Sequence, residues 1–246
     1  MITVVGAGEI AVWTVALDTI PQALWPRLAG LLDAAERGRA ERFRFGRDRR
    51  QYQAAHAVKR LMLTAADGDD VAPQAWAFEK GAHGKPRVAR GAGPWFNLSH
   101  CDGLVTCAAS QCVELGIDVE NLARRAPLEL AVTCFAPAEQ NWLRSLPAPA
   151  QQTGFFRLWT LKEAYVKATG HGFAQPLDAL AFGFDPLRVT FADQALGDPA
   201  TWRFEQRQVG ARYILALAWR TVAREVEVEV TPVRLEKLLN SGSVYL

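Results

Sequence analysis

One segment of this chain, residues 153–170, has the pattern of a helix with very little polar surface. Its large and small apolar residues are spread around the circumference: Phe155, Phe156, Trp159, Ala164, Tyr165 and Val166. A helix that is apolar on most sides must be covered by other elements, so the rest of the chain has to fold around it. The polar side chains that remain are Lys162, Glu163 and Lys167. We expect their edge of the helix to line a cleft.

A short acidic strand is expected upstream, at residues 116–120, with the sequence Gly-Ile-Asp-Val-Glu. Successive side chains of a strand alternate, so Asp118 and Glu120 share one face while the apolar residues between them face a core. If the strand meets the helix, Glu163 becomes a third carboxylate beside lysine side chains. Mg²⁺ prefers such oxygen ligands, and lysine ammonium groups would meet the phosphates of a substrate. This combination predicts a phosphoryl-transfer site, although each feature alone also suits a solvated surface.

The bulk composition sets limits on the class of protein. The 246 residues are half hydrophobic and 22% charged, with a net charge of +2, which suits one large domain or two small ones. The near-neutral charge does not indicate a nucleic-acid or membrane partner, and no apolar run is long enough to span a membrane. The apolar N-terminus lacks a basic leader, and Glu9 interrupts it, so we expect no signal peptide.

The four cysteines and four histidines show no metal-ligand spacing. We therefore expect reduced thiols instead of a disulfide framework or a zinc site, in a cytoplasmic protein.

The pattern along the chain repeats once in outline. Helical segments are expected at 29–42 and 48–66. Four strands should follow: one that begins at 76–78, one that ends near residue 99, and two at 103–110 and 115–120. A second series starts with helices at 128–134 and 137–146, continues with the apolar helix, and ends with strands at 181–184, 187–191, 202–208 and 213–219. Residues 223–246 read as a terminal strand and a loosely held tail. We expect an α+β protein whose helices pack on mostly antiparallel sheets.

Four ordered motifs resemble those of a known family, the 4′-phosphopantetheinyl transferases of the surfactin-synthetase-activating (Sfp) type. The family signature joins a G-[ILV]-D-[ILVA]-E strand to W-[ST]-x-K-E-[AS]-x-x-K some forty residues later. Both are complete here, at residues 116–120 and 159–167. Two further blocks also match, Gly84-Lys85-Pro86 and Phe96-Asn97-Leu98-Ser99-His100. The resemblance covers roughly residues 35–220.

The resemblance implies two similar halves related by a pseudo-twofold axis, with the active site in the cleft between them. We expect an N-terminal half at 1–112, a C-terminal half at 113–222 and a terminal strand and tail at 223–246. The implied reaction moves the 4′-phosphopantetheine group of coenzyme A to a serine of an acyl or peptidyl carrier protein and releases 3′,5′-ADP. The length favours a monomer with broad carrier specificity.

The resemblance also implies a role for each matched residue. Asp118, Glu120 and Glu163 would bind Mg²⁺, with Mn²⁺ as the alternative. Glu163 and Lys167 would be catalytic, the glutamate as base for the serine proton, directly or through water. The residues expected to bind coenzyme A are Arg47, Lys85, Ser99, His100, Lys162 and Lys167.

A cluster of seven arginines lies between Arg37 and Arg50. By resemblance some of them, Arg47 first, would bind the 3′-phosphate of coenzyme A, although Glu36 stands where the family often has lysine. Two other function classes remain open on the sequence. The cluster could make the chain a nucleic-acid-binding protein, or the fold could be a non-catalytic module that binds carrier proteins.

Overall fold

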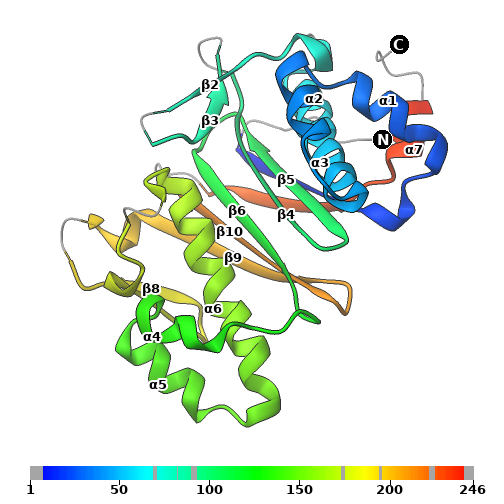
Figure 1. Cartoon of the computed structure of the whole chain (residues 1–246). Helices are drawn as coiled ribbons and strands as arrows, with labels where there is room; N and C mark the ends of the chain where they lie inside the picture. The colour runs from blue at the N-terminus through cyan, green and yellow to red at the C-terminus, as the bar shows by residue number, and fades with distance from the viewer. Residues whose placement is uncertain are drawn as a thin grey trace. The chain divides into compact units, whose positions relative to one another are not determined.

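The computed structural model describes residues 8–68, 71–81, 83–89, 93–172, 175–193, 196–221 and 225–240. The chain divides into two compact units, each with helices packed on sheets, which places the fold in the α+β class (Figure 1). Unit 1 comprises Met1–Gly81, Pro86–Glu114 and Arg224–Leu246, and unit 2 comprises Ala82–Lys85 and Leu115–Ala223.

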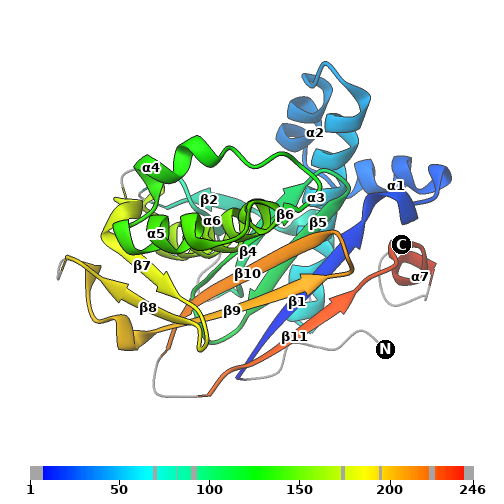
Figure 2. The same ribbon diagram turned by 90° about the horizontal axis from the view of Figure 1, so that it is seen from below.

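Unit 1 is built on a sheet in the order β11-β1-β5-β4. Its strands are β1 (Glu9–Ala16), β4 (Trp95–Cys101), β5 (Leu104–Ser110) and β11 (Glu227–Pro232). The β1–β5 and β5–β4 pairs are antiparallel, whereas β11 runs parallel to β1. A separate hairpin joins β2 (Phe78–Lys80) to β3 (Pro86–Val88). Figure 2 shows β11 alongside β1 at the edge of the sheet.

The helices of unit 1 are α1 (Trp25–Gly30), α2 (Ala34–Glu41), α3 (Gly46–Ala66) and α7 (Leu235–Asn240). The expected single helix over 29–42 is therefore two helices. The break has a local cause, because Asp33 caps α2 through the Glu36 backbone N–H while the Glu36 side chain accepts from the Asp33 N–H. This capping box starts a new helix at that point. Helix α3 packs on β5 and β4, and its apolar side forms the centre of the unit 1 core.

The C-terminal segment differs from the expected loose tail. Leu235, Leu238 and Leu239 of α7 are at most 7% exposed and belong to the core of unit 1. The described part of this segment, residues 225–240, is thus an integral part of unit 1. β11 forms the edge of the sheet beside β1, and α7 packs into the core. No short-range pattern in the sequence indicates either contact.

Unit 2 is built on a sheet in the order β6-β10-β9, with all neighbours antiparallel. Its strands are β6 (Leu115–Asn121), β9 (Trp202–Val209) and β10 (Tyr213–Arg220), and a hairpin joins β7 (Leu180–Gly183) to β8 (Arg188–Phe191). The helices are α4 (Ala131–Cys134), α5 (Pro137–Ser145) and α6 (Ala148–Thr169). Helix α6 crosses the sheet against β6 and β10 (Figure 1).

The apolar helix is longer than the sequence pattern predicts. It begins at Ala148, five residues before the expected start at 153. Pro149 fits the first turn because the N–H groups there have no partner within the helix, so its missing N–H costs nothing. The expected end is confirmed, since Gly170 adopts the left-handed conformation with φ of 73° and its N–H donates to the Val166 carbonyl. Among the described residues, no helix has the length and apolar character needed to cross a membrane.

Candidate active site

A glycine brings the acidic strand and the apolar helix into backbone contact. A Cβ added to Gly116 would lie 2.2 Å from the Ala164 carbonyl oxygen and 2.3 Å from the Ala168 nitrogen. Only glycine allows β6 and α6 to approach so closely. The opposite residues on β10 are also small, with Ala218 across from Gly116 and Ala216 across from Asp118. The helix therefore lies directly over the face of β6 that carries the two acids.

This approach brings the acids of β6 to the polar edge of α6. Lys167 Nζ lies 2.6 Å from Asp118 Oδ1, an ion pair in which the aspartate side chain is 8% exposed and the lysine 27%. Glu120 Oε1 lies 3.4 Å from Arg124 Nη2. Three of the expected site residues, Asp118, Glu120 and Lys167, thus share one region of unit 2.

Glu163 lies close enough to these groups for their charges to affect its pKa and for its charge to affect that of Glu120. Burial, with the negative charge of Asp118 as the next cause, raises the pKa of Glu120 to about 7. Burial and the charge of Asp118 also raise the pKa of Glu163, although Lys167 opposes the shift. Like charges held together out of water destabilise one another. A cation or a proton at this point would relieve that repulsion.

The donor set suits Mg²⁺ when the ion is shared with a phosphate substrate. In the described parts of the chain, no group of three or more His, Cys, Asp or Glu side chains is placed to enclose a metal ion by itself. Mg²⁺ rarely needs such a cage, because it commonly takes one or two carboxylates together with waters and substrate phosphates. The partly buried carboxylates of Glu120 and Glu163, whose pKa values are raised, and the buried carboxylate of Asp118 fit that requirement. The expected ligands Asp118, Glu120 and Glu163 therefore remain candidates.

Lys162 does not lie at this site. Its side chain is 0% exposed, and its Nζ donates to the Leu177 and Leu180 carbonyls, both at 2.7 Å, and pairs with Glu139 Oε2 at 2.7 Å. The three donors of the ammonium are thus used inside unit 2. The structure gives Lys162 an internal role in place of the predicted contact with coenzyme A.

The partner of this lysine, Glu139, was missed by the sequence reasoning. Its carboxylate accepts from the backbone N–H groups of Ala136 and Phe182 at 2.8 Å each. Burial raises the pKa of Glu139 and lowers that of Lys162, and their mutual attraction opposes both shifts. The pair therefore ties α6 to the start of α5 and to β7. Its only sequence signal is a glutamate two residues after Pro137, the usual place for an acid in the first turn of a helix.

Lys85 also contacts the end of α6. Its Nζ donates to the Ala168 carbonyl at 2.8 Å and to the Leu115 carbonyl at 3.1 Å. A cation beside the last carbonyls of a helix stabilises them. In this structure Lys85 joins the start of β6 to the C-terminus of α6. Its expected contact with the nucleotide stays a prediction.

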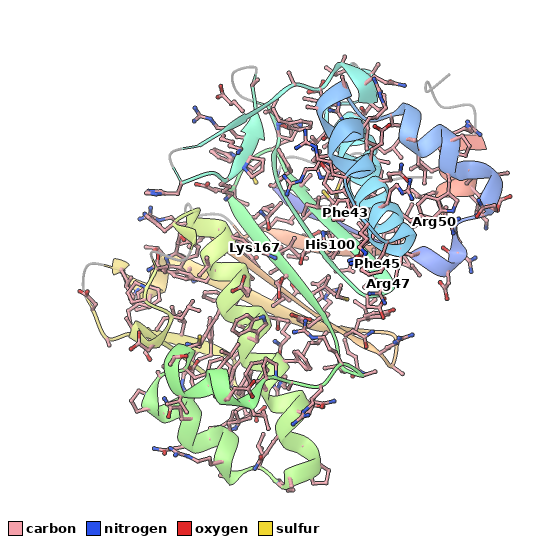
Figure 3. All side chains as sticks on the ribbon, in the orientation of Figure 1. Phe43, Phe45, Arg47, Arg50, His100 and Lys167 are labelled. Atoms are coloured by element: carbon pink, nitrogen blue, oxygen red, sulfur yellow. The ribbon has the colours of Figure 1, made fainter. Side chains whose placement is uncertain are left out.

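In unit 1, two expected residues lie where α3 meets the β4–β5 turn. His100 is exposed on β4, and its Nδ1 lies 2.7 Å from Gln51 Nε2. Arg47 lies in the first turn of α3 (Figure 3). Its Nη1 is 3.8 Å from Asp102 Oδ1. Ser99 alternates with His100 along the strand and is 5% exposed, so it points to the opposite face. The two side chains therefore point to opposite faces of the strand, and their expected contacts with the phosphates of coenzyme A stay predictions.

The other arginines of the cluster have varied local partners. Three guanidinium groups lie over aromatic rings: Arg39 over Tyr52, Arg44 over Phe45 and Arg50 over Trp25, at 5.7, 5.5 and 5.4 Å. Glu36, at the position where the family often has lysine, is buried and accepts bonds from His56, Lys59 and Arg60. The negative charge that Glu36 introduces at this position is thus balanced by basic side chains within unit 1.

Comparisons with known proteins agree with the motif positions. The model of the 4′-phosphopantetheinyl transferase superfamily matches residues 114–218, the segment that contains β6, α6 and most of β10. The chain is 41% identical over 172 residues to the 4′-phosphopantetheinyl transferase HetI of Nostoc sp., which covers 68% of this chain and 71% of that protein.

Two further relatives extend the match. A putative 4′-phosphopantetheinyl transferase of Synechocystis sp. is 30% identical over 219 residues, 85% of this chain and 87% of its own length. The 4′-phosphopantetheinyl transferase Sfp of Bacillus subtilis is 32% identical over 104 residues, 42% of this chain and 46% of its own length. With identity and coverage of this extent, the chain belongs to the 4′-phosphopantetheinyl transferase family.

Proposed function

We propose that this chain transfers the 4′-phosphopantetheine group of coenzyme A to a serine hydroxyl of an acyl or peptidyl carrier protein, in a Mg²⁺-dependent reaction. The observation that carries the proposal is the group of partly buried acids, Asp118, Glu120 and Glu163, beside the ammonium of Lys167. A site of this charge pattern suits a pyrophosphate together with a divalent cation.

The reaction is an in-line displacement at the β-phosphorus of coenzyme A. The serine oxygen forms a bond to that phosphorus, and the bond from phosphorus to the bridging oxygen breaks. The electron pair of the broken bond leaves with 3′,5′-ADP. When bound by Asp118, Glu120 and Glu163, Mg²⁺ would polarise the pyrophosphate and neutralise part of its charge.

Glu163 is the group to which we assign the serine proton. Burial and then the charge of Asp118 raise its pKa when no cation is bound. Because a carboxylate that binds Mg²⁺ is a weaker base, we assign the proton transfer to a route through a water molecule. Lys167 would stabilise the charge that builds on the departing phosphate. In unit 1, we assign phosphate contacts to His100 and Arg47, whose side chains are both exposed. We also propose that the enzyme acts as a cytoplasmic monomer, which size-exclusion chromatography with light scattering and cell fractionation would test.

The decisive experiment incubates the protein with coenzyme A, MgCl₂ and an apo-carrier protein, and follows the mass of the carrier. The carrier should gain one phosphopantetheine group, and EDTA should prevent the gain. Glu163→Gln should lower the rate by on the order of 10²- to 10⁴-fold, the usual contribution of a general base, while coenzyme A affinity changes little. Glu129→Gln, at an exposed position of the same unit, serves as control. No mass gain with the wild type would reject the function, whereas equal loss of binding and turnover would make Glu163 a metal ligand only.

A further inference from the structure

Lys85 joins the two elements that carry the candidate metal ligands, β6 and α6. Its Nζ donates to the carbonyl of Ala168, in the last turn of α6, at 2.8 Å. The same Nζ donates to the carbonyl of Leu115, the first residue of β6, at 3.1 Å. The lysine and both elements belong to unit 2. One half-buried side chain thus connects the start of the strand to the end of the helix.

The Ala168 carbonyl needs a donor from outside α6, because the last carbonyls of a helix have no partner within it. Ala168 and Leu115 are 2% and 0% exposed, so water has little access to replace the lysine. A cation also meets the negative end of the helix dipole here. Gly170 ends the helix, and a Cβ at that position would lie 3.3 Å from Lys85 Cδ. The aliphatic part of the lysine therefore packs against the end of α6.

The two hydrogen bonds lie next to the residues that bring the charged groups together. Leu115 directly precedes Gly116, where the backbone of β6 touches that of α6. Ala168 directly follows Lys167, whose Nζ lies 2.6 Å from Asp118 Oδ1. A change in the spacing of strand and helix at this point would therefore alter the distance between Lys167 and Asp118.

We propose that Lys85 is a positioning residue, which holds the end of α6 on β6 and so sets the distance between the charged groups of the two elements. It would act through the backbone of the strand and the helix, without touching the reacting atoms. The inference rests on the proposed function, because it takes Asp118, Glu163 and Lys167 to act in the transfer. It differs from the contact with the nucleotide that the family resemblance implies for this lysine.

The first test follows amide hydrogen exchange and needs no substrate. Lys85→Met removes the donor for both carbonyls, so exchange should become faster in β6 and in the last turn of α6, and stay unchanged in α3. Lys85→Arg should keep the wild-type pattern, because a guanidinium group can donate to two carbonyls. Lys80→Met is the matched control, since Lys80 is exposed on the nearby strand β2. It should leave exchange in all three elements unchanged.

The second test separates positioning from nucleotide binding and from stability. With coenzyme A, MgCl₂ and the apo-carrier, Lys85→Met should lower kcat by about 10- to 100-fold, as expected when reacting groups are slightly misplaced. KM for coenzyme A should change little, and so should the affinity for 3′,5′-ADP measured by calorimetry. Lys85→Arg should restore most of the rate. A purely structural role would lower the melting temperature but leave kcat unchanged in assays well below that temperature.

The outcomes distinguish the inference from the function on which it rests. Wild-type hydrogen exchange in β6 and α6 of Lys85→Met would overturn the inference, and so would a wild-type kcat. A weaker affinity for 3′,5′-ADP at an unchanged kcat would replace it with the predicted nucleotide contact. Failure of the proposed function would appear differently, as a wild-type protein that transfers nothing from coenzyme A to the apo-carrier.

Discussion

Lys162 and Lys167 show how a motif can place the same residue type in two environments. They lie five positions apart on α6, so they point to different sides of the helix. Lys162 is fully buried against Glu139, whereas Lys167 is 27% exposed and pairs with Asp118. The sequence predicted both to lie near coenzyme A. The distinction depends on what packs against each side of the helix, and the periodicity of the helix alone does not contain that information.

The two lysines should respond in opposite ways to the same substitution. Lys162→Met leaves the Glu139 carboxylate buried without its cation, so the free energy of unfolding should fall by about 3–5 kcal/mol. The affinity of the folded protein for coenzyme A should change little. Lys167→Met should weaken coenzyme A binding, and because Lys167 is partly exposed the free energy of unfolding should fall less than in Lys162→Met. Urea denaturation measures the free energy of unfolding, and calorimetry measures the affinity for coenzyme A. A Lys162→Met protein with normal stability but reduced affinity would support the predicted contact of Lys162 with coenzyme A.

Glu36 is a second residue whose role depends on the fold. Burial would raise its pKa, but the bonds from His56, Lys59 and Arg60 outweigh burial and hold the pKa well below its usual range. Burial also lowers the pKa of His56, and its bond to Glu36 only partly opposes this shift. A group with a depressed pKa contributes stability at pH values above its unfolded pKa, and this contribution is lost as the pH falls. Both groups therefore make unit 1 less stable in acid.

The pH dependence of unfolding tests this network. The wild-type free energy of unfolding should decrease as the pH falls below about 6.5, where unfolded histidine titrates, and again below about 4.3, where unfolded glutamate titrates. Glu36→Gln should cost about 3–5 kcal/mol at neutral pH because it leaves buried cations unpaired. Its curve should then be flatter below about pH 4.3. Parallel curves for the two proteins in urea titrations would show that Glu36 carries no depressed pKa.

At the scale of elements, the acidic site depends on how closely β6 and α6 pack. Strand alternation correctly predicted that Asp118 and Glu120 share a face. The strand lies where the sequence placed it, whereas the helix begins five residues earlier than predicted. The backbone contact at Gly116 was not predicted, because a glycine in a strand has several explanations. It is this contact that brings Lys167 to Asp118.

Gly116→Ala tests the packing of the two elements. The added methyl group would overlap backbone atoms of α6, which cannot move aside like a flexible side chain. Overpacking of this kind costs about 1–3 kcal/mol, and the displaced helix should also lower transferase activity. The control is Gly38→Ala in α2, where an added Cβ meets no atom within 4 Å. That change should be neutral or stabilising by roughly 0.5–1 kcal/mol. Thermal denaturation measures the stability of both variants. A Gly116→Ala protein as stable as the wild type would contradict the backbone contact between β6 and α6.

At the scale of the whole molecule, the chain returns at its C-terminus to the strand near its beginning. β11 pairs in parallel with β1, and Glu9 lies opposite Glu227 in the register. A parallel partner so distant in sequence produces no turn signal, since hairpin turns connect only antiparallel strands. For this reason the sequence indicated a terminal strand but not its neighbour, and it treated the following helix as a tail.

Leu235→Ala tests whether the C-terminal helix belongs to the core of unit 1. Leu235 is 1% exposed, so its truncation should lower the free energy of unfolding by about 2–5 kcal/mol. Leu128→Ala, at a position that is 39% exposed, should change it by less than about 0.5 kcal/mol. Hydrogen exchange should show the loss of protection in β1 and α3. Equal stabilities of the two variants would show that α7 is a loosely held tail and does not contribute to the core of unit 1.

The sequence by itself determined the elements and motifs, because helix and strand periodicity, caps and breakers act within a few residues of the chain. It therefore predicted the α+β class, the acidic strand, the apolar helix with its end at Gly170, and the family to which the motifs belong. Only the tertiary structure decided which side chains meet across long separations: Glu139 with Lys162, Gln51 with His100, and β11 with β1. Such contacts depend on the packing of whole elements and on the burial of charge, and neither is encoded in local spacing.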